Sequence, residues 1–360
     1  HNENSNNYGN VGLGTSNLLS MACEMLLNSD SENSSFMLIE EPEAHIHAQR
    51  QLKMMQSLQG GKKNQQIIMT THSLMLTSVV ELKNLILLQE HKAYPMGKEY
   101  TLSDDNDYKY LERYLDATKS NLFFAKGVLI VEGPGEELLL PSIAKLIGRK
   151  LTDYGVSIVD VKSTGLMRYA KIFQRKNDDW LKLPVACITD RDILPDCAPA
   201  ICIKTDYSDK AKWPKSRKWK VESEITDKKA CLDEIKNKSE GQYVKVYIPE
   251  QWTLEYELAL SGLAVDMLNV IAEMRATEES NKEELIEKYT GKYATYNTDE
   301  EKASYVYSFF RKKYISKAEF AQYFSIYIEE KYASKAANEM EKIFPCYLID
   351  AIKYVTSTLT

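Results

Sequence analysis

The chain has 360 residues, of which 44% are hydrophobic and 27% are charged, and a formal net charge of −6. This is the composition of an ordinary globular protein with two or three domains, and no apolar run approaches the roughly 20 residues of a membrane-spanning helix. Six scattered cysteines without a Cys-x-x-Cys pair and only five histidines argue against a zinc site, and with no signal-peptide pattern we expect a cytoplasmic protein with reduced thiols.

Residues 1–90 have the pattern of a first α/β unit. Short, continuously apolar runs predict strands, and one apolar–polar stretch between two of them predicts a helix. Because a helical crossover joins parallel strands, this order predicts a parallel βαβ unit. The predicted elements are helices over 11–27 and 48–58 and strands over 36–39, 66–70 and 85–88.

Two successive acids follow the first predicted strand of this unit. Glu40 and Glu41 directly follow Phe-Met-Leu-Ile, and His72 comes at the end of the next strand. Two acids at a strand end suit nucleotide hydrolysis, in which one holds Mg²⁺ through water and the other polarises the attacking water. We therefore predict Glu40 and Glu41 as nucleotide-binding residues and His72 as a sensor of the γ-phosphate. The alternative is a solvated strand end and a capping histidine.

Residues 91–125 are polar and mixed, which predicts a linker, and 126–260 form a second α/β unit. A stretch with Pro, Lys and Trp, 193–240, interrupts this unit as an inserted excursion. The spacing over 261–360 is helical and rich in tyrosine, which predicts a helical C-terminal region. The predicted elements are a loop over 103–107, helices over 110–115, 136–149 and 166–175, and strands over 127–132, 156–161, 184–189 and 243–248.

Acidic residues follow two apolar strands of the second unit. Glu132 comes after the first strand, and Asp190 and Asp192 come after a later one. Because α/β folds build their sites at the carboxyl edge of the sheet, we expect these acids to lie together. Glu136 opens the helix that follows Glu132, with Glu137 as the alternative. Crowded carboxylates repel one another unless a cation neutralises them, and oxygen ligands select Mg²⁺ or Mn²⁺, so the pattern predicts metal-dependent phosphate chemistry.

Although the net charge is negative, the stretch from Lys204 to Lys220 is basic, with seven Lys or Arg against two Asp. Trp213 and Trp219 lie among these basic residues. Lys and Arg neutralise DNA phosphates, and Trp stacks on unpaired bases. The alternative is a solvated loop whose tryptophans pack inward. The candidate DNA-binding residues are Lys212, Trp213, Lys215, Arg217 and Lys218.

The first unit resembles ABC-type ATPases in the form used by the OLD (overcoming lysogenization defect) family. Glu-Glu-Pro-Glu-Ala-His-Ile-His, 40–47, resembles the Walker B motif and D-loop, and His72 matches the switch histidine. Gly-Leu-Gly-Thr-Ser-Asn, from Gly12, resembles the ABC signature motif. This resemblance implies that Gly12, Gly14 and Ser16 contact the γ-phosphate of a nucleotide held by a second subunit.

A Walker A loop, Gly-x-x-x-x-Gly-Lys-Ser/Thr, is absent from the sequence. In the OLD family that loop lies near the N-terminus, and this chain starts without Met, so we expect that a front part is missing. As it stands, the chain should bind ATP poorly. The expected fold is α/β: the C-terminal half of an ABC-type ATPase, then a Toprim domain with a Rossmann-like parallel sheet, then a helical region.

The acids of the second unit resemble the Toprim pattern that topoisomerases, bacterial primases and OLD nucleases share. That pattern has a Glu after the first strand and Asp-x-Asp after a later one, and OLD-type domains add acids for a second metal and a distant Lys. Glu257 is an alternative to the last acid, and Lys312 and Lys313 are alternatives to the Lys. The resemblance implies Glu132, Glu136, Asp190, Asp192 and Glu255 as metal ligands and Glu132, Asp190, Asp192 and Lys317 as catalytic residues.

The resemblance implies a DNA endonuclease or nickase in which two Mg²⁺ or Mn²⁺ ions about 4 Å apart clamp the scissile phosphate. ATP at the ATPase part, once the missing loop is supplied, would govern assembly or activity. Family members commonly serve in anti-phage defence, including Gabija-type and retron-linked systems. The expected partners are DNA, further copies of the chain in a homodimer or larger assembly, and a helicase or retron-type protein. The alternatives are a Toprim topoisomerase or primase-like enzyme and a non-catalytic, ATP-gated SMC-like DNA clamp.

Overall fold

The computed structural model divides the chain into two compact units, and no helix among its described residues is long and apolar enough to cross a membrane. The first unit holds residues 1–97 and 108–124, and the second holds 98–107 and 125–360. The structure describes residues 12–27, 35–60, 65–115, 119–162 and 165–357.

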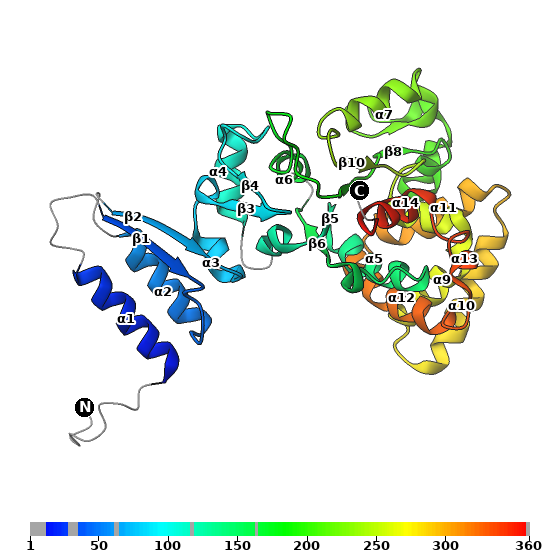
Figure 1. Cartoon of the computed structure of the whole chain (residues 1–360). Coiled ribbons are helices and arrows are strands. Elements are labelled where there is room, and N and C mark those ends of the chain that lie inside the picture. The colour runs from blue at the N-terminus through cyan, green and yellow to red at the C-terminus, as the bar shows by residue number, and fades with distance from the viewer. Residues whose placement is uncertain (1–11, 28–34, 61–64, 116–118, 163–164, 358–360) are drawn as a thin grey trace. The chain divides into compact units, whose positions relative to one another are not determined.

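The first unit is built on two parallel strands that are in register from Ser35 opposite Gln65 to Glu40 opposite Thr70. A helix crosses from one strand to the other, which confirms the predicted βαβ unit. Two helices, α1 and α2, cover the same face of the strand pair (Figure 1). The elements are α1 (Leu13–Leu27), β1 (Ser35–Glu40), α2 (Ala48–Gln59), β2 (Gln65–Thr70), α3 (Leu74–Val79) and the antiparallel pair β3 (Ile86–Gln89) and β4 (Lys92–Pro95).

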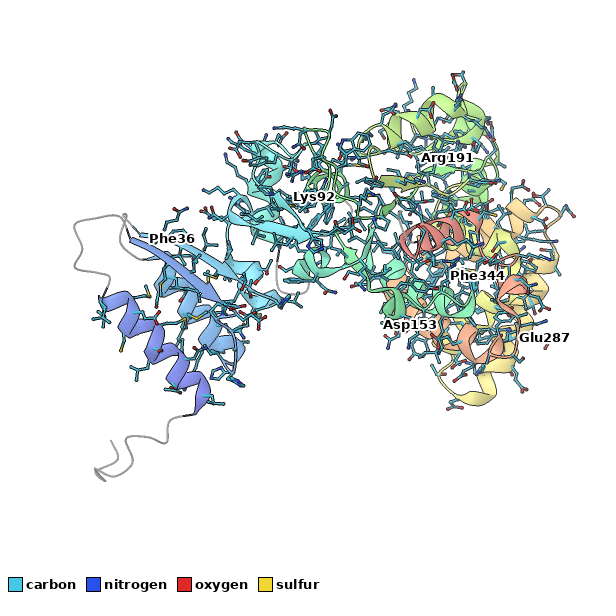
Figure 2. The ribbon with its side chains drawn as sticks, in the orientation of Figure 1. Phe36, Lys92, Asp153, Arg191, Glu287 and Phe344 are labelled. Carbon is cyan, nitrogen blue, oxygen red and sulfur yellow. The ribbon has the colours of Figure 1, made fainter. Side chains whose placement is uncertain are left out.

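The two faces of β1 differ in exposure although the strand is apolar throughout. Met37 and Ile39 are buried beneath the helices, whereas the alternate side chains, Phe36 and Leu38, are 57% and 71% exposed. Phe36 is labelled in Figure 2. The difference follows from the alternation of side chains along a strand. In the described part of this unit, helices therefore cover one face of the strand pair and leave the other face of β1 exposed.

The predicted loop over 103–107 is wrong at its second half, because helix α4 (Asp105–Tyr114) already includes residues 105–107. The side chain of Asp104 accepts hydrogen bonds from the backbone N–H groups of Asn106 and Asp107, each at 2.8 Å. An aspartate in this position satisfies N–H groups that have no partner within the helix, and so it starts the helix earlier than the polar sequence suggests.

The second unit contains a four-stranded sheet with the strand order β10–β7–β5–β6, and every pair in it is parallel. The two central strands are buried along their whole length, as expected for parallel strands covered on both faces. All four predicted strands are confirmed with small shifts at their ends. The elements are β5 (Gly127–Val131), α5 (Pro134–Leu146), β6 (Val156–Asp160), α6 (Leu166–Lys171), β7 (Val185–Ile188) and β10 (Val244–Tyr247).

The excursion over 193–240 begins with a strand that pairs with a second strand later in the same stretch. β8 (Ile193–Leu194) directly follows the acidic loop after β7, and it pairs in parallel with β9 (Lys220–Val221). Helix α7 (Lys228–Lys236) then leads back to β10. The excursion is therefore fastened at its start to the segment that carries Asp190 and Asp192.

The residues after β10 are helical throughout the described part, as predicted, and they share one hydrophobic core with the sheet. Gly127 of β5 shows how close this packing is, because a Cβ there would lie 2.3 Å from the carbonyl oxygen of Val355. Ser142 of α5 donates a hydrogen bond of 2.6 Å to Glu329 of α12. The helices are α8 (Leu254–Leu258), α9 (Ala264–Arg275), α10 (Glu279–Ala294), α11 (Asp299–Arg311), α12 (Lys317–Lys331), α13 (Ala337–Met340) and α14 (Cys346–Val355).

Candidate active site

Two adjacent strands bring the first acids to one edge of the sheet. Glu132 directly follows β5, and Asp190 lies two residues after β7. The last residues of these parallel strands, Val131 and Ile188, are opposite each other, so both loops leave from the same edge. The hydroxyl of Thr189 donates a hydrogen bond to Glu132, which ties the two loops together.

Glu136 reaches this edge from the first turn of α5. The helix begins at Pro134, and Gly133 is extended with φ −160° and ψ 172°, so Glu132 lies outside the helix. The Glu136 side chain folds back toward that turn, since its Oε2 would be 3.5 Å from a Cβ on Gly133. Gly133 itself adopts an extended backbone conformation that is open to any residue.

Glu255 and Lys317 complete the cluster from two helices far along the chain. Glu255, in α8, is buried, and its Oε2 lies 2.8 Å from the Nζ of Lys317, the first residue of α12. The backbone N–H of Leu254 donates a 3.1 Å hydrogen bond to Asp190. The start of α8 is thereby fastened to the loop after β7, and the distant pair is held beside the sheet edge.

The structure also separates the alternative residues from this cluster. Glu257 is buried but accepts a hydrogen bond from the backbone N–H of Gln251. Glu137, Lys312 and Lys313 are exposed, as Lys317 is, so the salt bridge of Lys317 with Glu255 and not its burial distinguishes it. The contacts therefore favour Glu136, Glu255 and Lys317 as the members of the cluster, and their chemical roles stay predictions.

Asp192 occupies the open side of the site. It is exposed, and its backbone has a left-handed φ of 58°, a conformation that costs energy for most residues other than glycine and asparagine. Its N–H donates to the carbonyl oxygen of Trp252 at 3.2 Å, and its charge raises the pKa of Glu132. Asp192 is thus held near Glu132 by a constrained backbone.

The surroundings of the acids at this edge disfavour their ionised form. Burial and the neighbouring charge of Glu255 raise the pKa of Glu136 to about 7. Burial likewise raises the pKa of Glu132 and of Asp190. Although burial lowers the pKa of Lys317, the charges of Glu255, Tyr307 and Asp190 raise it above its usual value. A divalent cation bound at this edge would offset the cost of ionising these acids.

The donor set fits a hard divalent cation in its chemistry, since every acidic donor is a carboxylate oxygen. Within the stretches that the structure describes, no three acidic, histidine or cysteine side chains already form a group able to hold a metal ion. Glu255, which pairs with Lys317, is one of the acids that would have to reorient. Metal binding therefore requires rotation of side chains at this edge while the strands and helices stay in place.

Two residues of this region were not predicted. Thr189 orients Glu132, and Arg191, between the two aspartates, is buried with a carboxylate partner. A signal for the arginine exists in the sequence, because an arginine at the end of a buried strand requires an acidic partner. Which acid pairs with it depends on the path of the excursion, and the sequence alone does not give that path.

In the first unit, the structure brings Glu41 and His72 together. Glu40 ends β1, and Glu41 follows with φ 40° and its Oε1 at 3.7 Å from Nε2 of His72. All three side chains are exposed. Glu43 holds the segment in place by accepting hydrogen bonds of 2.7 Å from the Thr71 hydroxyl and the His72 N–H. These acids and the histidine therefore share one surface at the end of the strand pair.

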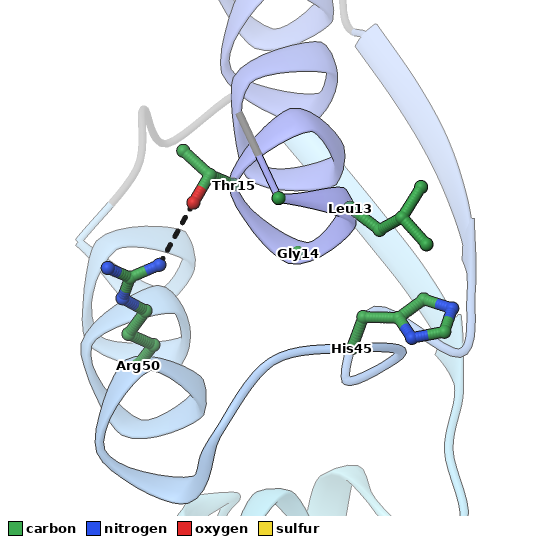
Figure 3. Close-up of a pocket in the computed structure, with 6 residues that line it drawn as sticks. Leu13, Gly14, Thr15, His45 and Arg50 are labelled. Carbon is green, nitrogen blue, oxygen red and sulfur yellow. Dashed lines mark hydrogen bonds between the residues drawn. The ribbon is translucent and has the colours of Figure 1, made fainter. Parts of the chain in front are cut away.

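The glycines at the start of α1 border a separate pocket of about 360 Å³ (Figure 3). Gly14 is required there, because a Cβ would lie 2.1 Å from the carbonyl oxygen of His45. Arg50 donates a 3.1 Å hydrogen bond to the Thr15 hydroxyl, and Ser16 follows in the first turn of the helix. The residues lining the pocket are Gly12, Leu13, Gly14, Thr15, His45 and Arg50.

The tryptophans of the basic stretch have partners within the protein. The rings of Trp213 and Trp219 are 5.0 Å apart, and the Arg217 guanidinium lies 4.8 Å and 4.5 Å from them. Trp213 also donates to the carbonyl oxygen of Tyr207 at 2.8 Å. These contacts occupy ring surface that stacking on a base would need. The exposed lysines of this stretch include Lys212, Lys215 and Lys218.

We expect the metal-free protein to lose stability as the pH rises. The pKa of Glu136 is about 7 in the folded state and near 4.5 when unfolded, so the folded state binds more protons between these values. The contribution of Glu136 to the free energy of unfolding is therefore highest below about pH 4.5. It falls by on the order of 3 kcal/mol as the pH rises to about 7.

Thermal unfolding in EDTA from pH 5 to pH 8.5 measures this effect. Mg²⁺ should restore the melting temperature at pH 8, and E136Q should show a smaller loss with pH than the wild type. An unchanged pH dependence in E136Q would show that Glu136 does not carry the excess proton.

Two protein families match this chain, each in a different segment. Residues 123–192 match the family described as overcoming lysogenization defect protein-like, TOPRIM domain, and residues 2–77 match the AAA ATPase domain family. A curated relative, Endonuclease GajA of Bacillus cereus (strain HuB5-5), is 25% identical over 219 residues, which cover 51% of this chain and 31% of the relative. The chain thus spans about a third of the length of that relative.

The solved structures that match parts of this chain include C-terminal regions of OLD proteins. That of Xanthomonas campestris pv. campestris is 24% identical and has a TM-score of 0.40, with 66% of this chain and 94% of that chain covered. That of Burkholderia pseudomallei is 21% identical and has a TM-score of 0.39, with 65% of this chain and 98% of that chain covered.

Proposed function

We propose that this OLD-family chain, in which an ATPase-type segment precedes a Toprim domain, is a divalent-metal-dependent DNA endonuclease or nickase. The observation that carries the proposal is the cluster at the carboxyl edge of the sheet. Glu132 and Asp190 leave from adjacent strands there, and the ion pair of the buried Glu255 with Lys317 is fastened to Asp190 through α8. The name of the curated relative, Endonuclease GajA, supports the same class of activity.

The acids of the cluster would hold two Mg²⁺ or Mn²⁺ ions, which supply a hydroxide for attack on a DNA phosphate and stabilise the leaving oxygen. Thr189 keeps Glu132 oriented through its hydroxyl. Lys317 carries a fixed positive charge beside the acids and would neutralise charge that builds on the phosphate. The ligands in this proposal are Glu132, Glu136, Asp190, Asp192 and Glu255.

The ATPase-type segment would add regulation by nucleotide. Glu40, Glu41 and His72 would act on ATP, while the pocket that holds Gly12 and Gly14 would contact the nucleotide of a second copy. Contact with the nucleotide of a second copy would require an assembly of at least two copies. ATP binding needs a Walker A loop, which this sequence does not contain. A cytoplasmic role in anti-phage defence, with a helicase or retron-type partner, belongs to the same proposal.

Incubation of the chain with supercoiled plasmid in Mg²⁺ or Mn²⁺ tests the activity. We expect nicked or linear DNA, and none in EDTA, because the proposed mechanism needs the metal ions to supply the hydroxide. Relaxation to closed topoisomers without nicks would instead support a topoisomerase with a tyrosine nucleophile. Unchanged plasmid that is nevertheless bound would support an ATP-gated clamp.

A further inference from the structure

Arg191, between the two aspartates of the acidic loop, has its side chain buried against the excursion. Only 3% of the side chain is exposed. Its Nη1 lies 2.6 Å from Oε1 of Glu222 and its Nη2 lies 3.4 Å from Oε2, so the contact is bidentate. Nη1 also donates to the carbonyl oxygen of Glu250 at 2.6 Å. The guanidinium therefore joins the acidic loop to two other segments.

The backbone of the same loop is fixed as well. The N–H groups of Arg191 and Asp192 both donate to the carbonyl oxygen of Trp252, at 2.9 Å and 3.2 Å. Beyond Asp192 the chain enters β8, which pairs with β9, and β9 ends directly before Glu222. The excursion thus holds the acidic loop through a strand pair and through the ion pair of Arg191 with Glu222.

A buried ion pair of this kind is weak evidence for stability. Taking both charges out of water costs free energy that their attraction only partly offsets, and apolar residues of similar volume often stabilise a fold as well. Outer residues that orient metal ligands, in contrast, commonly change metal affinity or activity by roughly 10- to 100-fold when they are replaced. The position of Arg191, next to two predicted ligands, favours the second role.

We propose that Arg191, anchored by Glu222, is a positioning residue that fixes Asp190 and Asp192 for metal binding. The excursion over 193–240 then sets the geometry of the acidic edge, in addition to any contact that it makes with DNA. This inference rests on the proposed metal site, but it concerns metal affinity and does not require that DNA is the substrate.

Binding of Mn²⁺ to the whole chain, measured by calorimetry without DNA, tests the inference. We expect E222Q to raise the Mn²⁺ Kd by about 10- to 100-fold, because the arginine loses its bidentate partner. Lys228 provides the matched control, since its exposed side chain places Nζ 3.0 Å from Oε2 of Glu222. K228Q should bind Mn²⁺ as the wild type does, because exposed ion pairs contribute little. A wild-type Kd in E222Q would overturn the inference.

The double variant R191M/E222M separates positioning from stability. Replacing both partners leaves no unpaired charge, so its melting temperature should be near that of the wild type while its Mn²⁺ affinity stays reduced. Restored Mn²⁺ binding in this variant would show that the pair only stabilises the fold. Wild-type chain that binds Mn²⁺ but leaves plasmid uncut would contradict the proposed nuclease alone, whereas wild-type chain that binds no Mn²⁺ would contradict both proposals.

Discussion

Replacing Asp190 by asparagine is expected to reduce DNA cleavage by about 1000-fold. Metal ions at a phosphoryl centre contribute several kcal/mol to transition-state stabilisation, and about 1.4 kcal/mol corresponds to a factor of ten in rate. Asparagine keeps the shape of the side chain and an oxygen for the 3.1 Å hydrogen bond from Leu254. The loss would therefore come from the missing charge, with the start of α8 still in place.

Initial rates of plasmid nicking at saturating Mg²⁺ measure this effect. D153N is the matched control, because Asp153 is an exposed aspartate of the same unit that pairs with Lys150 at 3.9 Å and accepts a 3.4 Å hydrogen bond from the Thr152 hydroxyl. D153N should cleave as the wild type does. Cleavage by D190N at the wild-type rate, with both variants folded, would remove Asp190 from the site.

Replacing Lys317 by methionine is expected to reduce turnover by about 100- to 1000-fold, the usual cost of losing one group that stabilises charge in the transition state. Metal binding should respond differently. Lys317 pairs with Glu255 at 2.8 Å, so its removal frees a carboxylate for the cation. The Mn²⁺ Kd should therefore stay the same or fall while kcat drops.

The exposed Lys313 supplies the comparison, since it was an alternative candidate from the sequence. K313M should match the wild type in both kcat and Mn²⁺ Kd. Equal losses in K313M and K317M would mean that general positive charge near this surface matters, and would contradict a specific role for Lys317.

The sheet was predictable because its signal is local. β5 and β7 are short, continuously apolar runs, and an acid follows each. Parallel strands then place Glu132 and Asp190 at one edge without further information. Alternation along β1 was less visible, because Phe36 and Leu38 are as apolar as the buried residues beside them. Local patterns therefore gave the strands, but not which faces are covered.

The rest of the site depends on contacts between distant segments. Glu255 and Lys317 came from a family resemblance, and only the packing of α8 and α12 beside the sheet puts them in contact. The pairing of Arg191 with Glu222 depends on a two-residue strand pair that closes the excursion. Loop paths of this kind are set by tertiary packing, so no spacing rule in the sequence reveals them.

The central claim is that the acids at the carboxyl edge of β5 and β7 hold the metal that cleaves DNA. Crystals of the chain soaked in Mn²⁺ and measured at the manganese absorption edge test it most directly. We expect anomalous peaks bound by Glu132 and Asp190, with Glu136 or Glu255 completing the shell. Peaks only at other residues, at a Mn²⁺ concentration that supports cleavage, would contradict the claim.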